Sequence, residues 1–79
     1  MIYNLDKVRI SPRVFQTWVI TADSGMKGLR QKYPGLLASD VPDERFRLLP
    51  DGTGEIFVKV KAVSIRMRVP KDEFVIDET

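Results

Sequence analysis

The stretch RFRLLPDGTGEIFVKVKAVSIRMRV, residues 45–69, decides the fold of this chain. From Ile56 onward it alternates apolar with cationic or polar residues, which is the two-residue period of a half-buried β-strand. A break in this alternation at Ala62-Val63 predicts a β-bulge or a tight turn, and we favour two strands joined near residues 62–64. Upstream, residues 50–54 combine Pro, Asp and two Gly, the composition of a tight reversal. We therefore predict a hairpin between residues 45–49 and the strand that begins at Ile56.

The segments on either side predict further short elements. Residues 7–10 form a predicted strand, and Pro70 is expected to end the sheet before a last short strand at residues 74–76. Residues 11–22 are ambiguous, because a Ser-Pro start and helical apolar spacing compete with a β-branched and aromatic composition. We favour a strand there, with one or two short helical turns between residues 24 and 48.

The composition indicates one small domain over residues 1–79. Hydrophobic residues make up 43% of the chain and charged residues 30%, the mixture of a globular protein. The sequence has no apolar run long enough for a membrane span and no signal-peptide pattern at its start, so we expect a cytoplasmic protein without membrane contact. A core this small also predicts a homodimer or a partner protein that helps to bury apolar surface.

Most common catalytic chemistries are excluded because the chain has no Cys and no His. Thiolate nucleophiles, imidazole bases and disulfides are therefore absent. Asp40, Asp43 and Glu44 remain as acid–base candidates, but the latter two follow Pro42, where a helix start would favour negative charge. They also lack the residue order of a calcium loop. We expect neither enzymatic activity nor a metal or cofactor.

Cationic residues are the strongest functional signal. The stretch from residue 56 to residue 69 carries four cations and no anion. Together with cations of the first predicted strand they form a basic patch suited to phosphates or to an acidic protein surface. A solvated sheet face would show the same pattern, since Lys and Arg are usual outward residues of antiparallel sheets. The predicted binding residues are Lys59, Lys61, Arg66, Arg68, Lys7, Arg9, Trp18, Lys27 and Arg30.

Two short segments match RNA-binding patterns. Gly25-Met26-Lys27-Gly28 fits the Gly-x-x-Gly loop with which KH domains hold an RNA backbone, although a flexible loop explains these glycines as well. Residues 63–72 resemble the strand and turn of the CsrA family of RNA-binding regulators. The His-Arg-Glu-Glu that follows this turn in the family is replaced by Phe74-Val75-Ile76-Asp77, so its RNA contacts do not carry over.

The order of the predicted elements is that of a mostly β protein, a small SH3-like barrel. An α+β winged-helix arrangement is the alternative if residues 11–22 are helical and residues 45–61 form the wing. The chain resembles the variable subunit of ferredoxin-thioredoxin reductase and related small accessory subunits. The resemblance is carried by Lys7-Val8-Arg9-Ile10, Gly25-Met26-Lys27-Gly28, Val58-Lys59-Val60, Val69 and Asp72-Glu73-Phe74.

That resemblance implies a non-catalytic protein that docks on a larger protein as an accessory subunit or inhibitor. The alternative is a nucleic-acid-binding regulatory module that uses the basic sheet face on phosphates. The two functions differ in their response to salt, because contacts to phosphates weaken steeply as salt rises and apolar protein contacts do not.

Overall fold

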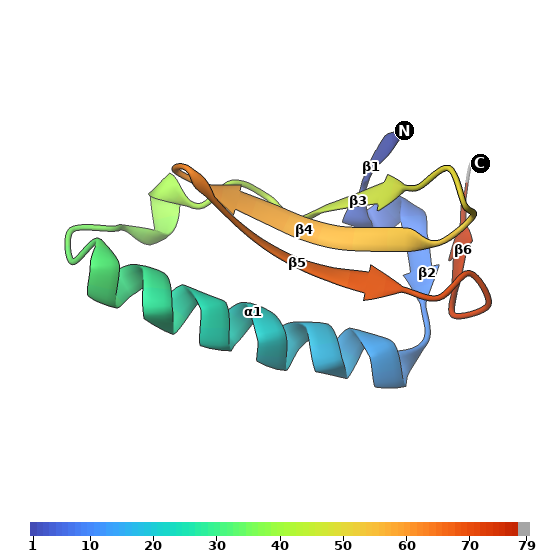
Figure 1. Cartoon of the computed structure of the whole chain (residues 1–79), viewed down its shortest axis with the longest axis horizontal. Helices are drawn as coiled ribbons and strands as arrows, with labels where there is room; N and C mark the ends of the chain where they lie inside the picture. The colour runs from blue at the N-terminus through green and yellow to red at the C-terminus, as the bar shows by residue number, and fades with distance from the viewer. Residues whose placement is uncertain (78–79) are drawn as a thin grey trace.

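The computed structural model describes residues 1–77, except for the side chain of residue 38, and shows an α+β fold (Figure 1). Four antiparallel strands form one open sheet in the order β1-β3-β4-β5, and two more form a separate antiparallel pair, β2-β6. The strands are β1 (Ile2–Asn4), β2 (Val8–Ile10), β3 (Arg45–Leu48), β4 (Gly54–Val60), β5 (Val63–Val69) and β6 (Phe74–Ile76). The helices are the 3-10 turns η1 (Leu5–Lys7) and η2 (Ala38–Asp40) and the long helix α1 (Pro12–Lys32).

Helix α1 replaces the strand expected over residues 11–22. It begins with Pro at its first turn, where the missing N–H costs nothing, and it buries Trp18 and Leu29 on one face. Helical spacing of the apolar residues therefore outweighed the β-branched composition, which is a weak preference once a face can be buried. Gly25 and Gly28 lie inside this helix, so the KH-type loop is wrong as well.

Both predicted reversals of the chain exist. The hairpin between β3 and β4 is confirmed, with Arg45 opposite Phe57 in its register. The tight turn between β4 and β5 consists of Lys61 and Ala62, one residue earlier than predicted, and Val60 pairs with Val63 across it. Lys61 has a φ of 57° while Ala62 has no positive φ. This pattern is that of a type II′ turn, whose right-handed twist suits two-residue hairpins.

The hydrophobic core lies between α1 and the sheet, which Figure 1 shows as two layers. Trp18 of the helix belongs to the same core as alternate residues of the strands, among them Phe46 and Ile56, which are fully buried. Helix and sheet approach closely at Gly25. A Cβ placed on this residue would lie only 2.9 Å from the side chain of Ile65. The other side of the four-stranded sheet is not covered by the helix.

The expected SH3-like barrel is wrong. The four-stranded sheet stays open, and β2 pairs with β6 in a second sheet instead of closing the first one. The winged-helix arrangement is not observed either, because residues 1–77 contain a single α-helix and residues 45–61 belong to the central sheet. No helix in the described part of the chain is both long enough and apolar enough to cross a membrane.

Candidate functional site

The candidate site is the side of the four-stranded sheet that faces away from α1. Because successive side chains of a strand point to opposite faces, the neighbours of the buried residues must point outward. Cross-strand pairing places these neighbours in rows, with Arg47 and Arg68 on either side of Glu55, and with Arg45 and Arg66 on either side of Phe57. We call this surface the outer face; it consists of Ile2, Asn4, Arg45, Arg47, Glu55, Phe57, Lys59, Ser64, Arg66 and Arg68.

Positive charge dominates the outer face. It presents five cationic side chains and a single carboxylate, that of Glu55. Glu55 is only 9% exposed, and its Oε1 lies 3.7 Å from Nη1 of Arg47. A carboxylate buried beneath arginines orients them and cancels one charge, so the face retains a strong net positive charge.

An aromatic ring lies at the centre of these cations. Phe57 is half-buried, and the guanidinium carbon of Arg47 lies 4.8 Å from its ring centroid. This distance falls within the range of a cation–π interaction. The guanidinium stacked over the ring lies between Arg45 and Arg66, which flank Phe57 on the neighbouring strands.

Two cations of the outer face have no counter-ion. Within residues 1–77, neither Lys59 nor Arg66 has a carboxylate within ion-pair distance, and both side chains are exposed. The other three cations each have a carboxylate nearby. Arg45 lies 3.9 Å from Asp43, Arg47 lies 3.7 Å from Glu55, and Arg68 lies 3.7 Å from Asp51. An unpaired cation on an exposed strand can bind a phosphate without first breaking an internal ion pair.

The turn between β3 and β4 contacts Arg68, which lies at one end of the outer face. Oδ1 of Asp51 accepts hydrogen bonds from the Thr53 hydroxyl at 2.6 Å and from the Thr53 backbone N–H at 3.0 Å. These two hydrogen bonds lower the pKa of the Asp51 carboxyl below its ordinary 3.8, and the nearby Arg68 guanidinium adds to the effect. Arg68 in turn donates to Thr53 Oγ1 at 3.1 Å and lies 3.7 Å from Asp51 Oδ2. The turn therefore positions Arg68.

The structure brings together only part of the predicted basic patch. Lys59, Arg66 and Arg68 lie on the outer face, whereas Lys61 lies in the turn after β4. The first-strand cations are elsewhere. Lys7 belongs to η1, and Arg9 belongs to β2 of the second sheet, where its Nη2 is 3.7 Å from Oδ2 of Asp77.

The remaining predicted contact residues come from α1 and do not join the outer face. Trp18 as a contact residue is wrong, because its side chain is 1% exposed and forms part of the core. Lys27 and Arg30 are exposed on the helix, which covers the opposite side of the sheet. Lys27 is also 3.9 Å from Asp23, one helical turn away.

Sequence reasoning missed most of the outer face beyond Lys59, Arg66 and Arg68, above all Arg45, Arg47 and Phe57. The signal was present, because Arg45 and Arg47 flank the apolar Phe46 in the same alternation that placed Lys59 outward. A predicted hairpin between residues 45–49 and the next strand also implies that outward residues of both strands share one face. Pairing the two predicted strands residue by residue would have added Arg45, Arg47 and Phe57 to the predicted patch.

The acid–base candidates Asp40, Asp43 and Glu44 each have a separate interaction partner. Oδ2 of Asp40 accepts from the Leu37 backbone N–H at 2.9 Å, Asp43 faces Arg45, and Glu44 accepts from Trp18. Among residues 1–77, no three carboxylates gather in a way that could hold a metal ion. No protein-family model, no curated protein and no solved structure matches this chain.

Proposed function

We propose that this protein is a non-catalytic binding module that takes single-stranded nucleic acid on its outer face. One observation carries the proposal: five cations surround a half-buried Phe57 on the open side of a four-stranded sheet. Cations that follow a phosphate backbone and an aromatic ring on which a base stacks are the two components of single-strand binding sites. The cytoplasm remains the proposed compartment.

A single strand fits the outer face better than a duplex does. Phe57 lies at the middle of a sheet surface, with β3 on one side and β5 on the other, so it does not project into a groove. A base reaches such a ring only when it is unstacked from its neighbours, as in loops and single strands. Because the guanidinium of Arg47 lies over this ring, the base stacks on the guanidinium plane, which Phe57 supports from below.

Fluorescence anisotropy tests the proposal. A labelled single strand of about 12 nucleotides, the upper range of one small binding domain, is titrated alongside a duplex of the same sequence. We expect the single strand to bind more tightly than the duplex. The variant Lys59→Ala/Arg66→Ala should bind the single strand at least about tenfold more weakly, because two unpaired cations are lost.

The matched control removes the same charge from α1. Lys27→Ala/Arg30→Ala lowers the net charge by the same amount, but neither residue lies on the outer face. This variant should bind as the wild type does. Equal losses in the two double variants would mean that net charge alone attracts the strand, and would contradict a site on the outer face.

Docking on a larger protein, as an accessory subunit or inhibitor, is the second candidate function. It is favoured by exposed apolar side chains on α1, where Phe15 is 39%, Val19 51% and Ile20 70% exposed. Large apolar side chains at a helix surface are typical of protein contacts. Co-purification of the tagged chain with nuclease at high salt tests it. A stoichiometric partner lost in Val19→Ser/Ile20→Ser would support docking, and no partner would count against it.

A further inference from the structure

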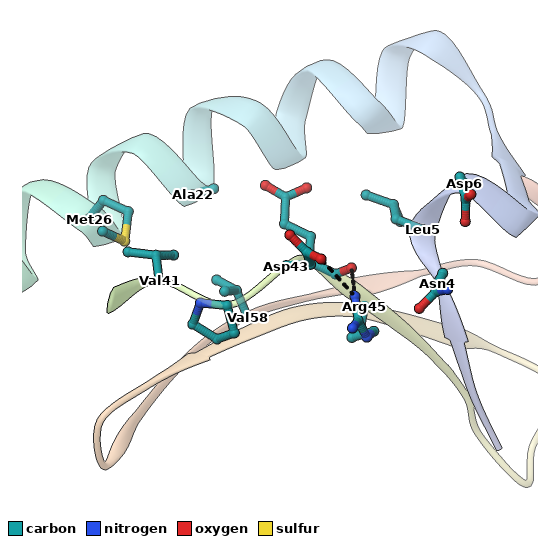
Figure 2. A pocket seen from close by; sticks show the side chains of 11 residues that line it. Asn4, Leu5, Asp6, Ala22, Met26, Val41, Asp43, Arg45 and Val58 are labelled. Carbon is teal, nitrogen blue, oxygen red and sulfur yellow. Dashed lines mark hydrogen bonds and ion pairs between the residues drawn. The ribbon is translucent and has the colours of Figure 1, made fainter. Parts of the chain in front are cut away.

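A pocket of about 570 Å³ opens on the side of the sheet that α1 covers. Figure 2 shows Ala22 and Met26 projecting from the helix on one wall, with Val41 and Val58 on the other. Leu5 of η1 closes one end. These residues come from four separate segments and give the pocket an apolar part, while polar and charged side chains make up the rest of its lining. Its volume is typical of sites for small organic ligands, which are about 300 to 1,000 Å³.

Three carboxylates also line this pocket: Asp6, Asp43 and Glu44. Asp43 is partly neutralised, because its Oδ2 lies 3.9 Å from Nη1 of Arg45. Asp6 and Glu44 have no cationic partner within residues 1–77. Arg45 of the outer face also lines the pocket, so three carboxylates and one guanidinium line it and its net charge is negative, opposite to that of the outer face.

The Glu44 carboxylate is held in place by the core. Its Oε2 accepts a hydrogen bond from Nε1 of Trp18 at 3.1 Å, and Trp18 is 1% exposed. In the described part of the chain Oε1 of Glu44 has no hydrogen-bond donor. A carboxylate fixed through one oxygen presents the other to a ligand without losing side-chain entropy on binding.

We propose that this pocket binds an organic cation, an ammonium or guanidinium group carried on an apolar stem. The apolar side chains take the stem, and Glu44 receives the charged end, while the exposed Asp6 adds negative charge at the end of the pocket marked by Leu5. Hydrogen bonds between a cation and a carboxylate are about twice as strong as neutral ones, and the apolar walls strengthen them further. The same chemistry occurs in a free amine and in a lysine side chain of a partner protein.

Trp18 supplies the measurement, because it is the single Trp of the chain and its indole N–H contacts the pocket carboxylate. The probe is 2-phenylethylammonium, titrated at constant ionic strength, and its neutral control is 2-phenylethanol. We expect a saturable change in Trp18 emission with the ammonium and binding at least about tenfold weaker with the alcohol, which loses the charged hydrogen bond.

Two variants locate the site. Glu44→Gln keeps an oxygen for the Trp18 indole and removes the charge, and Asp6→Asn removes a charge without touching Trp18. Glu44→Gln should weaken ammonium binding by about tenfold and Asp6→Asn by a smaller factor, with the thermal melts of both variants unchanged. Asp72→Asn, which removes the same charge from an exposed turn outside the pocket, should bind as the wild type does.

The source of the cation is decided by a second probe, N-acetyl-lysine methylamide, which presents a lysine side chain in a peptide. Tighter binding of this probe than of the free amine assigns the pocket to a partner's lysine, and the reverse assigns it to a small amine. The proposal is overturned if neither probe gives saturable binding, or if Glu44→Gln and Asp6→Asn both bind like the wild type. An amide NMR spectrum in which Ala22 and Met26 do not shift would also overturn it.

Discussion

The guanidinium carbon of Arg47 lies 4.8 Å from the centroid of the Phe57 ring, and Oε1 of Glu55 lies 3.7 Å from Nη1 of the same arginine. Arg47 is thus held between an aromatic ring and a nearly buried carboxylate. Two constraints on one long side chain reduce the rotamer entropy that binding would otherwise cost. The centre of the outer face is therefore ordered before any ligand arrives, while Lys59 and Arg66 at its margin stay unpaired.

Phe57→Leu tests stacking on the outer face. Leucine keeps much of the packing of a half-buried side chain, so the loss of folding stability should stay below about 1.5 kcal/mol. Binding of a single strand should weaken by about 1 to 3 kcal/mol, since the base loses the stack of guanidinium and ring that Phe57 supports. The control is a strand with abasic sugars, whose affinity should not change. An unchanged affinity for the normal strand would show that no base stacks on Phe57.

The two glycines of α1 should respond oppositely to alanine. A Cβ on Gly28 meets nothing within 4 Å, so Gly28→Ala should stabilise the helix by about 0.5 to 1 kcal/mol. A Cβ on Gly25 would lie 2.9 Å from Ile65, a buried β-branched side chain that has little freedom to move. Gly25→Ala should therefore destabilise the protein by about 1 to 3 kcal/mol. If Gly25→Ala and Gly28→Ala raised the midpoint of thermal unfolding equally, the close contact between α1 and β5 would be refuted.

Lys61→Gly should stabilise the turn between β4 and β5. Lysine holds a φ of 57° there, which costs an L-residue about 1 kcal/mol and costs glycine almost nothing. The midpoint of thermal unfolding should rise by about 4 to 8 °C per 1 kcal/mol in a chain of this size. Lys61→Ala removes the same charge but keeps the strain, and it should show no such gain. If both variants gained equally, charge and not backbone strain would be the cause.

Asp51 makes the turn between β3 and β4 sensitive to acid. Its pKa is lowered in the folded protein by the Thr53 hydrogen bonds, so the carboxylate stabilises the fold at pH above 3.8. That contribution is lost as the pH falls through the lower, folded value. The NMR shift of the Thr53 amide, which bonds to Asp51, should titrate with a midpoint below 3.8 in the wild type and stay flat in Asp51→Asn. A midpoint at or above 3.8 would contradict the hydrogen-bond geometry.

Local patterns predicted the strands better than the helix. The alternation from Ile56 onward and the turn residues at 50–54 predicted β3, β4 and β5. Both signals depend only on residues that are close together in the sequence. Residues 11–22 carried two conflicting signals, a helical spacing of apolar residues and a β-branched and aromatic composition. Only burial of Trp18 against the sheet decided between them, and that contact joins segments far apart in the sequence.

The outer face and the pocket differ in the same way, because local sequence patterns predict much of the first and contacts between distant segments form the second. Three cations of the outer face followed from the alternation of two strands, and the pairing of β3 with β4 adds Arg45 and Arg47. The pocket was not predictable in this way. Its lining includes Leu5, Ala22 and Val58, which approach one another only because α1 crosses the sheet at its observed place. The spacing of residues along the sequence does not predict where the helix crosses the sheet.

The salt dependence of single-strand binding tests the central claim most directly. Each phosphate neutralised by a cation contributes about 0.7 to the slope of log affinity against log salt concentration, so the five cations of the outer face predict a slope of up to about −3.5. Lys59→Ala/Arg66→Ala should reduce its magnitude by about 1.4, and Lys27→Ala/Arg30→Ala should leave it unchanged. A slope near zero, or one that both double variants lower equally, would contradict nucleic-acid binding by the outer face.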